Sequence, residues 1–195
     1  MKFEERITKR LLADGIILSE EEEIVNYGLE NLKSNLTGFL LTLLTGVCFH
    51  CLLESVVLWI LNFPLRKNAG GFHAKTKIRC ILLSAVVLLA TLGGMVRIIW
   101  PKIVYIGIAL VSFAFILYLA PVENPNKRLD KLERRVYGER TRMILAIEGT
   151  MLVIALVLDW DRLIAVSVAN FAIVGVSLIA GEMRVRKLMG RRNEL

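Results

Sequence analysis

The sequence has few cysteines and lacks several familiar motifs. Its three cysteines are an odd number and lie in or beside apolar runs, which excludes the fully paired disulfide framework of a small secreted domain. It contains no glycine-rich phosphate-binding loop. Its first residues mix charged with apolar side chains and form no continuous apolar core, so we expect no cleaved signal peptide.

Apolar side chains, in contrast, are abundant. Hydrophobic residues make up 55% of the chain, and the mean hydropathy is +0.59, which is too apolar for a soluble domain of 195 residues. The formal net charge of +7 would suggest nucleic acid as a partner of a soluble protein. Here the basic residues gather between apolar runs, as in loops that face anionic lipid. We therefore expect anionic lipid as a partner and no nucleic acid.

The pattern of apolar runs predicts two regions. Residues 1–35 form an N-terminal amphipathic region, because Phe3, Ile7 and Leu11 recur at helical spacing. Such helices either anchor in the membrane interface or form a short solvated bundle. Residues 36–195 form the membrane-embedded region, so the fold class is an all-α integral membrane protein.

Within this membrane-embedded region we expect four to six membrane segments in a multi-span helical bundle. The four clearest are residues 78–99, 103–120, 143–158 and 163–180. Residues 36–65 are long enough for one tilted helix but short of the roughly 40 residues that two full crossings require. They either cross once or enter and return as a broken hairpin.

The distribution of basic residues predicts which connections are cytoplasmic. The segment 66–79, the segment 121–142 with its seven basic residues, and the tail beyond residue 182 are all rich in lysine and arginine. The short connections at 100–102 and 159–162 then lie outside, which agrees with four crossings between residues 78 and 180.

The basic segment 66–79 contains His73, one of the two histidines, and is followed directly by Cys80, one of the three cysteines. A nucleophilic thiol needs a base within hydrogen-bond reach, and histidine can also return a proton to a leaving amine. On one straight helix, the Cα atoms of His73 and Cys80 would lie roughly 10 Å apart, too far for contact.

We therefore predict a non-helical turn from His73 to about Thr76, with Thr76 as the N-cap of the next helix. Cys80 would then lie near the start of that helix, where the macrodipole favours the thiolate. Spacing alone also permits a packed surface histidine and an inert buried cysteine.

These residues resemble a known family, the accessory gene regulator B (AgrB) family of bacterial membrane endopeptidases. The resemblance rests on Arg66, the core Ala69-Gly70-Gly71-x-His73-Ala74, and Cys80, all between a first apolar region and the next span. Chain length, span layout, the basic segment 121–142 and the basic tail are also similar to that family.

The resemblance implies a cysteine endopeptidase of the cell membrane, with its active site at the cytoplasmic face. His73 would be the base and Cys80 the nucleophile that cleaves a membrane-associated propeptide through an acyl-enzyme thioester. A cysteine or serine side chain of the propeptide would then close a thiolactone or lactone ring, giving the precursor of an autoinducing peptide for quorum sensing. Arg66 and Gly71 match positions linked to activity, although lipid anchoring and turn formation would also explain them.

The resemblance also implies a substrate contact and an assembly. The propeptide of the family has an acidic C-terminal part, which basic side chains of the segment 121–142 would hold: Lys127, Arg128, Lys131, Arg134 and Arg135. Retention of this segment on the cytoplasmic side explains the same residues. A homodimer is expected from the family, and we expect no metal or cofactor.

Two other patterns lead to rival interpretations. Cys48-x-x-Cys51 with His50 between them is typical of zinc or redox sites, but its place inside an apolar run favours structural burial. His50 and Glu54 are four residues apart, which places them on one helical face, and Glu148 falls in an expected span. Ionisable groups at membrane depth often mark function. These three residues define the alternative function, a small transporter with a polar route. A third hypothesis is a non-enzymatic membrane subunit.

Overall fold

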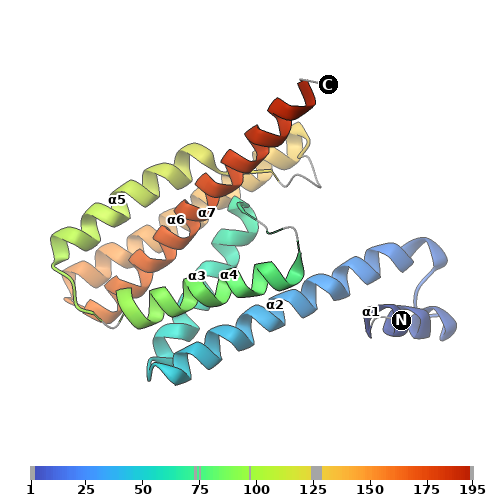
Figure 1. The fold of residues 1–195 in the computed structure, drawn as a ribbon, viewed down its shortest axis with the longest axis horizontal. Helices are drawn as coiled ribbons and strands as arrows, with labels where there is room; N and C mark the ends of the chain where they lie inside the picture. The colour runs from blue at the N-terminus through green and yellow to red at the C-terminus, as the bar shows by residue number, and fades with distance from the viewer. Residues whose placement is uncertain (1–2, 73, 75, 97, 124–128, 194–195) are drawn as a thin grey trace. The chain divides into compact units, whose positions relative to one another are not determined.

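The computed structural model describes residues 3–72, 74, 76–96, 98–123 and 129–193, and this part of the chain contains helices and no strand (Figure 1). It forms two compact units, Met1–Leu41 and Thr42–Leu195. The all-α prediction is confirmed.

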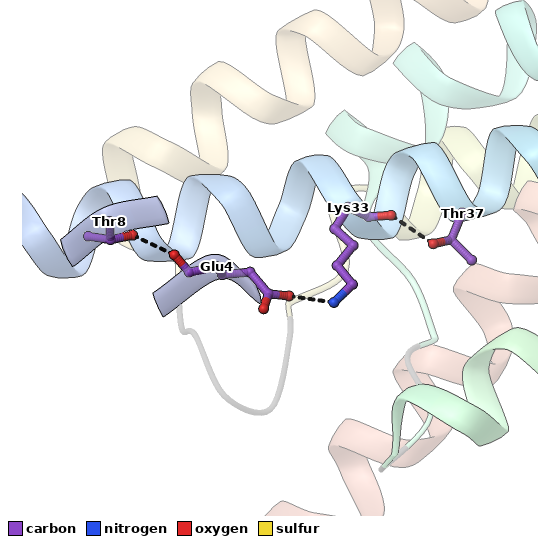
Figure 2. A network of polar contacts seen from close by, with 4 residues as sticks. All are labelled: Glu4, Thr8, Lys33 and Thr37. Atoms are coloured by element: carbon purple, nitrogen blue, oxygen red, sulfur yellow. Dashed lines mark hydrogen bonds and ion pairs between the residues drawn. The ribbon is translucent and has the colours of Figure 1, made fainter. Parts of the chain in front are cut away.

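The first unit contains α1 (Phe3–Ala13), η1 (Ser19–Glu21) and most of α2 (Glu22–Cys48). An ion pair of 2.9 Å between Lys33 Nζ and a Glu4 carboxylate oxygen joins α1 to α2 (Figure 2). The Thr8 hydroxyl donates to the Glu4 carbonyl at 3.0 Å, and both residues are buried. The ion pair thus links the two helices, whereas many of the large apolar side chains of α2 are exposed.

The apolar region 36–65 is not one long helix, because the chain breaks between α2 and α3 (Leu52–Ala69). At the break, His50 adopts a left-handed conformation (φ 53°), which a helix cannot accommodate. The Cys51 amide donates to the Gly46 carbonyl at 2.8 Å. The prediction of a single tilted helix is therefore wrong. The alternative of two helices separated by a break is the one that the structure shows.

The second unit is organised around its last helix. It contains α3, α4 (Lys77–Ala90) with the π-helical turn η2 (Thr91–Met95), α5 (Lys102–Leu119), α6 (Lys131–Val157) and α7 (Asp161–Asn193). Helices α3, α5 and α6 all pack against α7. Every residue from Ile164 to Phe171 is buried, which is the pattern of a helix that is enclosed on all sides.

Contacts between chain segments define two opposite ends of the second unit. At the first, which we call the site end, the Val122 amide donates to the Ala69 carbonyl at 2.9 Å and the Phe72 amide donates to the Ser177 carbonyl at 2.9 Å. At the far end, Lys102 pairs with Asp159, and Arg162 pairs with Glu54 at 2.7 Å. The connections 100–102 and 159–162 thus lie together, and the three basic regions meet at the site end.

Three of the described helices are long and apolar enough to cross a membrane: Ile78–Met95, Lys102–Leu119 and Asp161–Lys187. The expected span 143–158 does not join them, because Arg140, Arg142 and Glu148 interrupt or flank the apolar part of α6. Only 17% of the Ile78–Met95 segment is buried in the protein, against 61% of the Asp161–Lys187 segment. The chain is an all-α membrane protein in which α4 presents most of its apolar surface outwards and α7 forms the interior.

Candidate active site

The loop that follows α3 is held by two adjacent glycines and by Arg66. Gly70 and Gly71 have φ angles of 76° and 123°, a region that favours glycine. The Arg66 guanidinium donates through Nη1 to the Gly70 carbonyl and through Nη2 to the Phe72 carbonyl, the latter at 2.5 Å. A side chain at Gly71 would overlap this guanidinium. Arg66 and Gly71 therefore fix one loop conformation together.

Helix α7 forms the opposite side of this loop. The Phe72 amide donates to both the carbonyl and the hydroxyl oxygen of Ser177, at 2.9 Å and 3.1 Å. Gly181, one turn further along α7, lies against the backbone of Gly71 and Phe72. The Arg184 guanidinium lies over the Phe72 ring, 5.4 Å from its centroid. The Gly70–Phe72 loop is thus enclosed between α3 and α7.

Cys80 lies at the start of α4, as the sequence predicts. Residues 71, 72, 74 and 76 are non-helical, and α4 begins at Lys77. The Thr76 hydroxyl accepts from the Arg79 amide at 3.3 Å, and the Cys80 amide donates to the Thr76 carbonyl at 3.1 Å. The predicted N-cap is therefore confirmed, and the described residues of the predicted turn, 74 and 76, are non-helical. Cys80, a partly buried thiol that forms no disulfide, lies in the first turns of the capped helix.

Arg66 is electrostatically coupled to this thiol. It lies in the last turn of α3, at the site end, where burial lowers the pKa of its guanidinium to about 10. An ionised Cys80 sulfur acts in the opposite direction and raises the pKa of Arg66. The guanidinium remains charged at neutral pH, so it provides a positive charge within electrostatic range of Cys80.

His73 lies outside the described residues. It follows Phe72 directly in the chain, and Ala74 and Thr76 resume the described path towards Cys80. The pairing of His73 with Cys80 therefore stays a prediction. What the structure shows is the anchored loop before His73 and the capped helix that carries Cys80.

A second feature of the site end is a groove of about 710 Å³ between the end of α5 and the start of α6. Its basic lining residues are Lys131, Arg134, Arg135 and Arg142; Glu139 also lines it. Three of the predicted substrate-binding residues, Lys131, Arg134 and Arg135, thus share one groove, while Lys127 and Arg128 lie outside the described residues.

The groove is only partly neutralised by its own carboxylates. Arg135 pairs with Glu139 at 2.9 Å, and Arg134 approaches Glu123 at 3.7 Å. All three side chains of Arg134, Arg135 and Glu139 remain exposed for the most part. The groove therefore keeps a positive field that an acidic ligand could meet.

The residues of the transporter alternative do not gather in one route. Glu54 is buried and pairs with Arg162 at the far end, whereas Glu148 accepts from the Asn170 side-chain amide at 2.8 Å between α6 and α7. His50 is exposed in the turn between α2 and α3, so it does not share a helical face with Glu54. That shared face, expected from a spacing of four residues, is wrong because the helix starts only at Leu52.

The cysteine pair near this turn forms no disulfide. Cys48 is exposed and Cys51 is buried. In the described part of the chain, no three His, Cys, Asp or Glu side chains come together as a metal site requires.

Comparison with known proteins identifies the family. Residues 4–181 match the family described as Accessory gene regulator B. The chain belongs to the accessory gene regulator B family. It is also 42% identical over 57 residues to Protein FsrB of Enterococcus faecalis (strain ATCC 47077 / OG1RF), a match that covers 29% of this chain and 24% of that relative. No solved structure matches the chain. Membership of the accessory gene regulator B family supports a role in quorum-sensing regulation and an association with peptide processing.

Sequence reasoning missed the part of the site that α7 provides. Ser177 and Gly181 lie more than a hundred residues after the Gly70–Phe72 loop, within an apolar segment where serine and glycine are ordinary residues. Their spacing of four residues, which places them on one helix face, is the only local signal. It gives no indication of which loop that face contacts.

Proposed function

We propose that this member of the accessory gene regulator B family is a membrane cysteine endopeptidase with His73 and Cys80 as its catalytic pair. The observation that carries the proposal is the placement of Cys80 in the first turns of a capped helix, within electrostatic range of Arg66. Arg66 in turn holds the loop that leads into His73. A thiol near a helix start and a cation, with a histidine seven residues before it in the chain, supplies the groups that the proposed nucleophilic catalysis uses.

The proposed reaction has two transfers of one acyl group. His73 takes the thiol proton, and Cys80 Sγ attacks the carbonyl carbon of the scissile peptide bond. The C–N bond breaks, His73 gives the proton to the leaving amine, and the N-terminal part of the propeptide remains bound to Cys80 as a thioester. A thiol or hydroxyl of the propeptide then attacks this thioester. The ring closes as a thiolactone or lactone, and the proton returns to the Cys80 thiol.

The thioester is the species that tests this proposal most directly. The protein is reconstituted in vesicles with the peptide encoded by an adjacent reading frame, and the reaction is stopped with acid. Mass spectrometry of the digest should find the Cys80 peptide heavier by the mass of the N-terminal propeptide fragment. A propeptide whose ring-closing residue is replaced by alanine should increase this species, because its second transfer is blocked. Cleavage without any acylated Cys80 would contradict the proposal.

The groove between α5 and α6 is the proposed contact for the acidic C-terminal part of the propeptide. Its basic residues lie at the same end as Cys80 and include Lys131, Arg134 and Arg135. Because the groove begins where the Lys102–Leu119 segment ends, we propose that it lies at the depth of lipid headgroups. We propose that this end faces the cytoplasm, since basic regions are retained there.

Removing positive charge from the groove should weaken propeptide binding and leave the rate of the chemical steps nearly unchanged. For Arg134→Gln combined with Arg135→Gln, we expect KM to rise about three- to tenfold, because each exposed charge pair contributes about 0.2 to 1 kcal/mol. The value of kcat should stay within about twofold. The KM of the wild type should also rise more steeply with salt than that of the variant.

A matched control removes the same charge elsewhere. Arg140→Gln with Arg186→Gln also deletes two exposed arginines, and Arg186 forms an i,i+4 pair with Glu182 just as Arg135 does with Glu139. Neither control residue lines the groove. Equal KM values for the two double variants would show that net charge, rather than the groove, attracts the propeptide.

A further inference from the structure

We propose that Ser177 and Gly181 of α7 are positioning residues, which hold the Gly70–Phe72 loop so that the chain enters His73 in the arrangement needed for catalysis. This inference rests on the proposed cysteine endopeptidase and adds α7 to its machinery. It concerns two residues whose role is exerted through their contacts with Gly71 and Phe72 of the loop.

The first argument is the hydrogen bonding of Phe72. Its amide is the last described backbone donor before His73, and it donates to two oxygens of a single residue, the Ser177 carbonyl at 2.9 Å and the Ser177 hydroxyl at 3.1 Å. Both acceptors belong to a long helix that is enclosed by α3, α5 and α6. The loop is therefore attached to the helix that contacts α3, α5 and α6.

The second argument is the close approach at Gly181. A Cβ atom at this position would lie 2.8 Å from the Gly71 carbonyl carbon and 2.9 Å from the Phe72 amide nitrogen. Real Cβ atoms essentially never come this close, and both neighbours are backbone rather than flexible side chain. The absence of a side chain at Gly181 thus allows the loop to reach Ser177.

The third argument is that side chains of both α3 and α7 hold the loop. Arg66 bonds the Gly70 and Phe72 carbonyls on the α3 side, and Arg184 of α7 covers the Phe72 ring. Adjacent Cα atoms are about 3.8 Å apart, so a displacement of Phe72 carries over to the next residue. An error of about 1 Å in catalytic geometry can cost about a hundredfold in rate.

Substitutions on α7 test this role. In a protein whose only thiol is Cys80 (Cys48→Ser, Cys51→Ala), we expect Gly181→Ala to lower kcat by about thirty- to a hundredfold with KM within about threefold. Ser177→Ala should lower kcat about fivefold, since it removes one of two acceptors. Gly175→Ala is the matched control on the same helix, because a Cβ there meets its neighbours at an ordinary 3.5 Å; it should behave as wild type.

A second readout separates positioning from loss of folding. The rate of Cys80 alkylation by iodoacetamide is measured against pH in the same background and in its His73→Ala variant. Gly181→Ala should move the profile towards that of His73→Ala, whereas Gly175→Ala should leave it unchanged. If Gly181→Ala fails to accumulate in the membrane, Ser177→Ala is judged by the same two measurements.

Each negative outcome identifies what has failed. Wild-type kcat and an unchanged alkylation profile in Gly181→Ala or Ser177→Ala would overturn the positioning role, and so would a loss of activity with an unchanged profile. If cleavage instead persists after Cys80 itself is replaced, the proposed function is wrong, whatever the α7 variants do.

Discussion

Replacing Cys80 with serine should abolish propeptide cleavage, with a loss of at least about a thousandfold in kcat/KM. A serine hydroxyl at this place keeps the size of the side chain, but its ordinary acidity is far below that of a thiol, so neither the helix start nor Arg66 can make it anionic. Removal of a catalytic nucleophile typically costs several orders of magnitude. The measurement is the appearance of cleaved propeptide in reconstituted vesicles, with the amount of folded protein determined in parallel.

The other two cysteines and the buried Glu148 are the controls for this experiment. Cys48→Ser and Cys51→Ala should retain cleavage, because both thiols lie at the turn between α2 and α3, at the opposite end of α3 from the site loop. Glu148→Gln should also retain it, since glutamine can still accept from Asn170. A protein that transports solutes through a polar route would show the reverse: insensitivity to Cys80 replacement and loss of activity on changing Glu54 or Glu148.

Gly71→Ala should lower propeptide cleavage by about a hundredfold. Alanine is strained at φ 123°, and its methyl group would overlap the Arg66 guanidinium and lie 2.9 Å from the Ser177 hydroxyl oxygen. A left-handed conformation alone costs a non-glycine residue about 1–2 kcal/mol. We expect the loop to relax away from both Arg66 and α7, and the cleavage assay measures the consequence for the residues that follow it.

Gly107→Ala provides the corresponding control. This glycine lies in α5 of the same unit, and a Cβ there would meet nothing within 4 Å. The variant should cleave at the wild-type rate and should not lose stability, since alanine is the better helix former. If Gly71→Ala retains full activity, the loop conformation described for residues 70–72 is not the one in which catalysis occurs.

The sequence by itself determined the local structure around Cys80. Thr76 is a favoured N-cap residue, a non-helical turn is needed before it, and a long apolar stretch follows it, so the start of α4 could be predicted from neighbouring residues. The same applies to the fold class, because long apolar runs have few alternatives to membrane helices. The motif around Arg66, Gly71, His73 and Cys80 was specific enough to indicate the family.

The break in the first apolar region, between α2 and α3, could not be predicted from the sequence alone. Positions 49–51 hold no proline and no pair of charged residues that would require a break in the helix. The composition of residues 36–65 therefore allowed either one helix or two. The structure ends α2 at Cys48 and starts α3 at Leu52, where Glu54 meets Arg162. A buried carboxylate needs a partner, and that partner lies 108 residues away in the chain.

Only the tertiary structure decided what surrounds the site loop. The two carbonyls that Arg66 binds become neighbours only once Gly70 and Gly71 take left-handed conformations, and Ser177 and Gly181 reach the loop only because α7 packs against α3. Likewise, the basic residues of α6 form a groove only against the end of α5. Local patterns specify which residues cap, break or span, because those effects act within one or two helical turns. They cannot specify which distant helix faces which loop, because that choice is made by packing the whole unit.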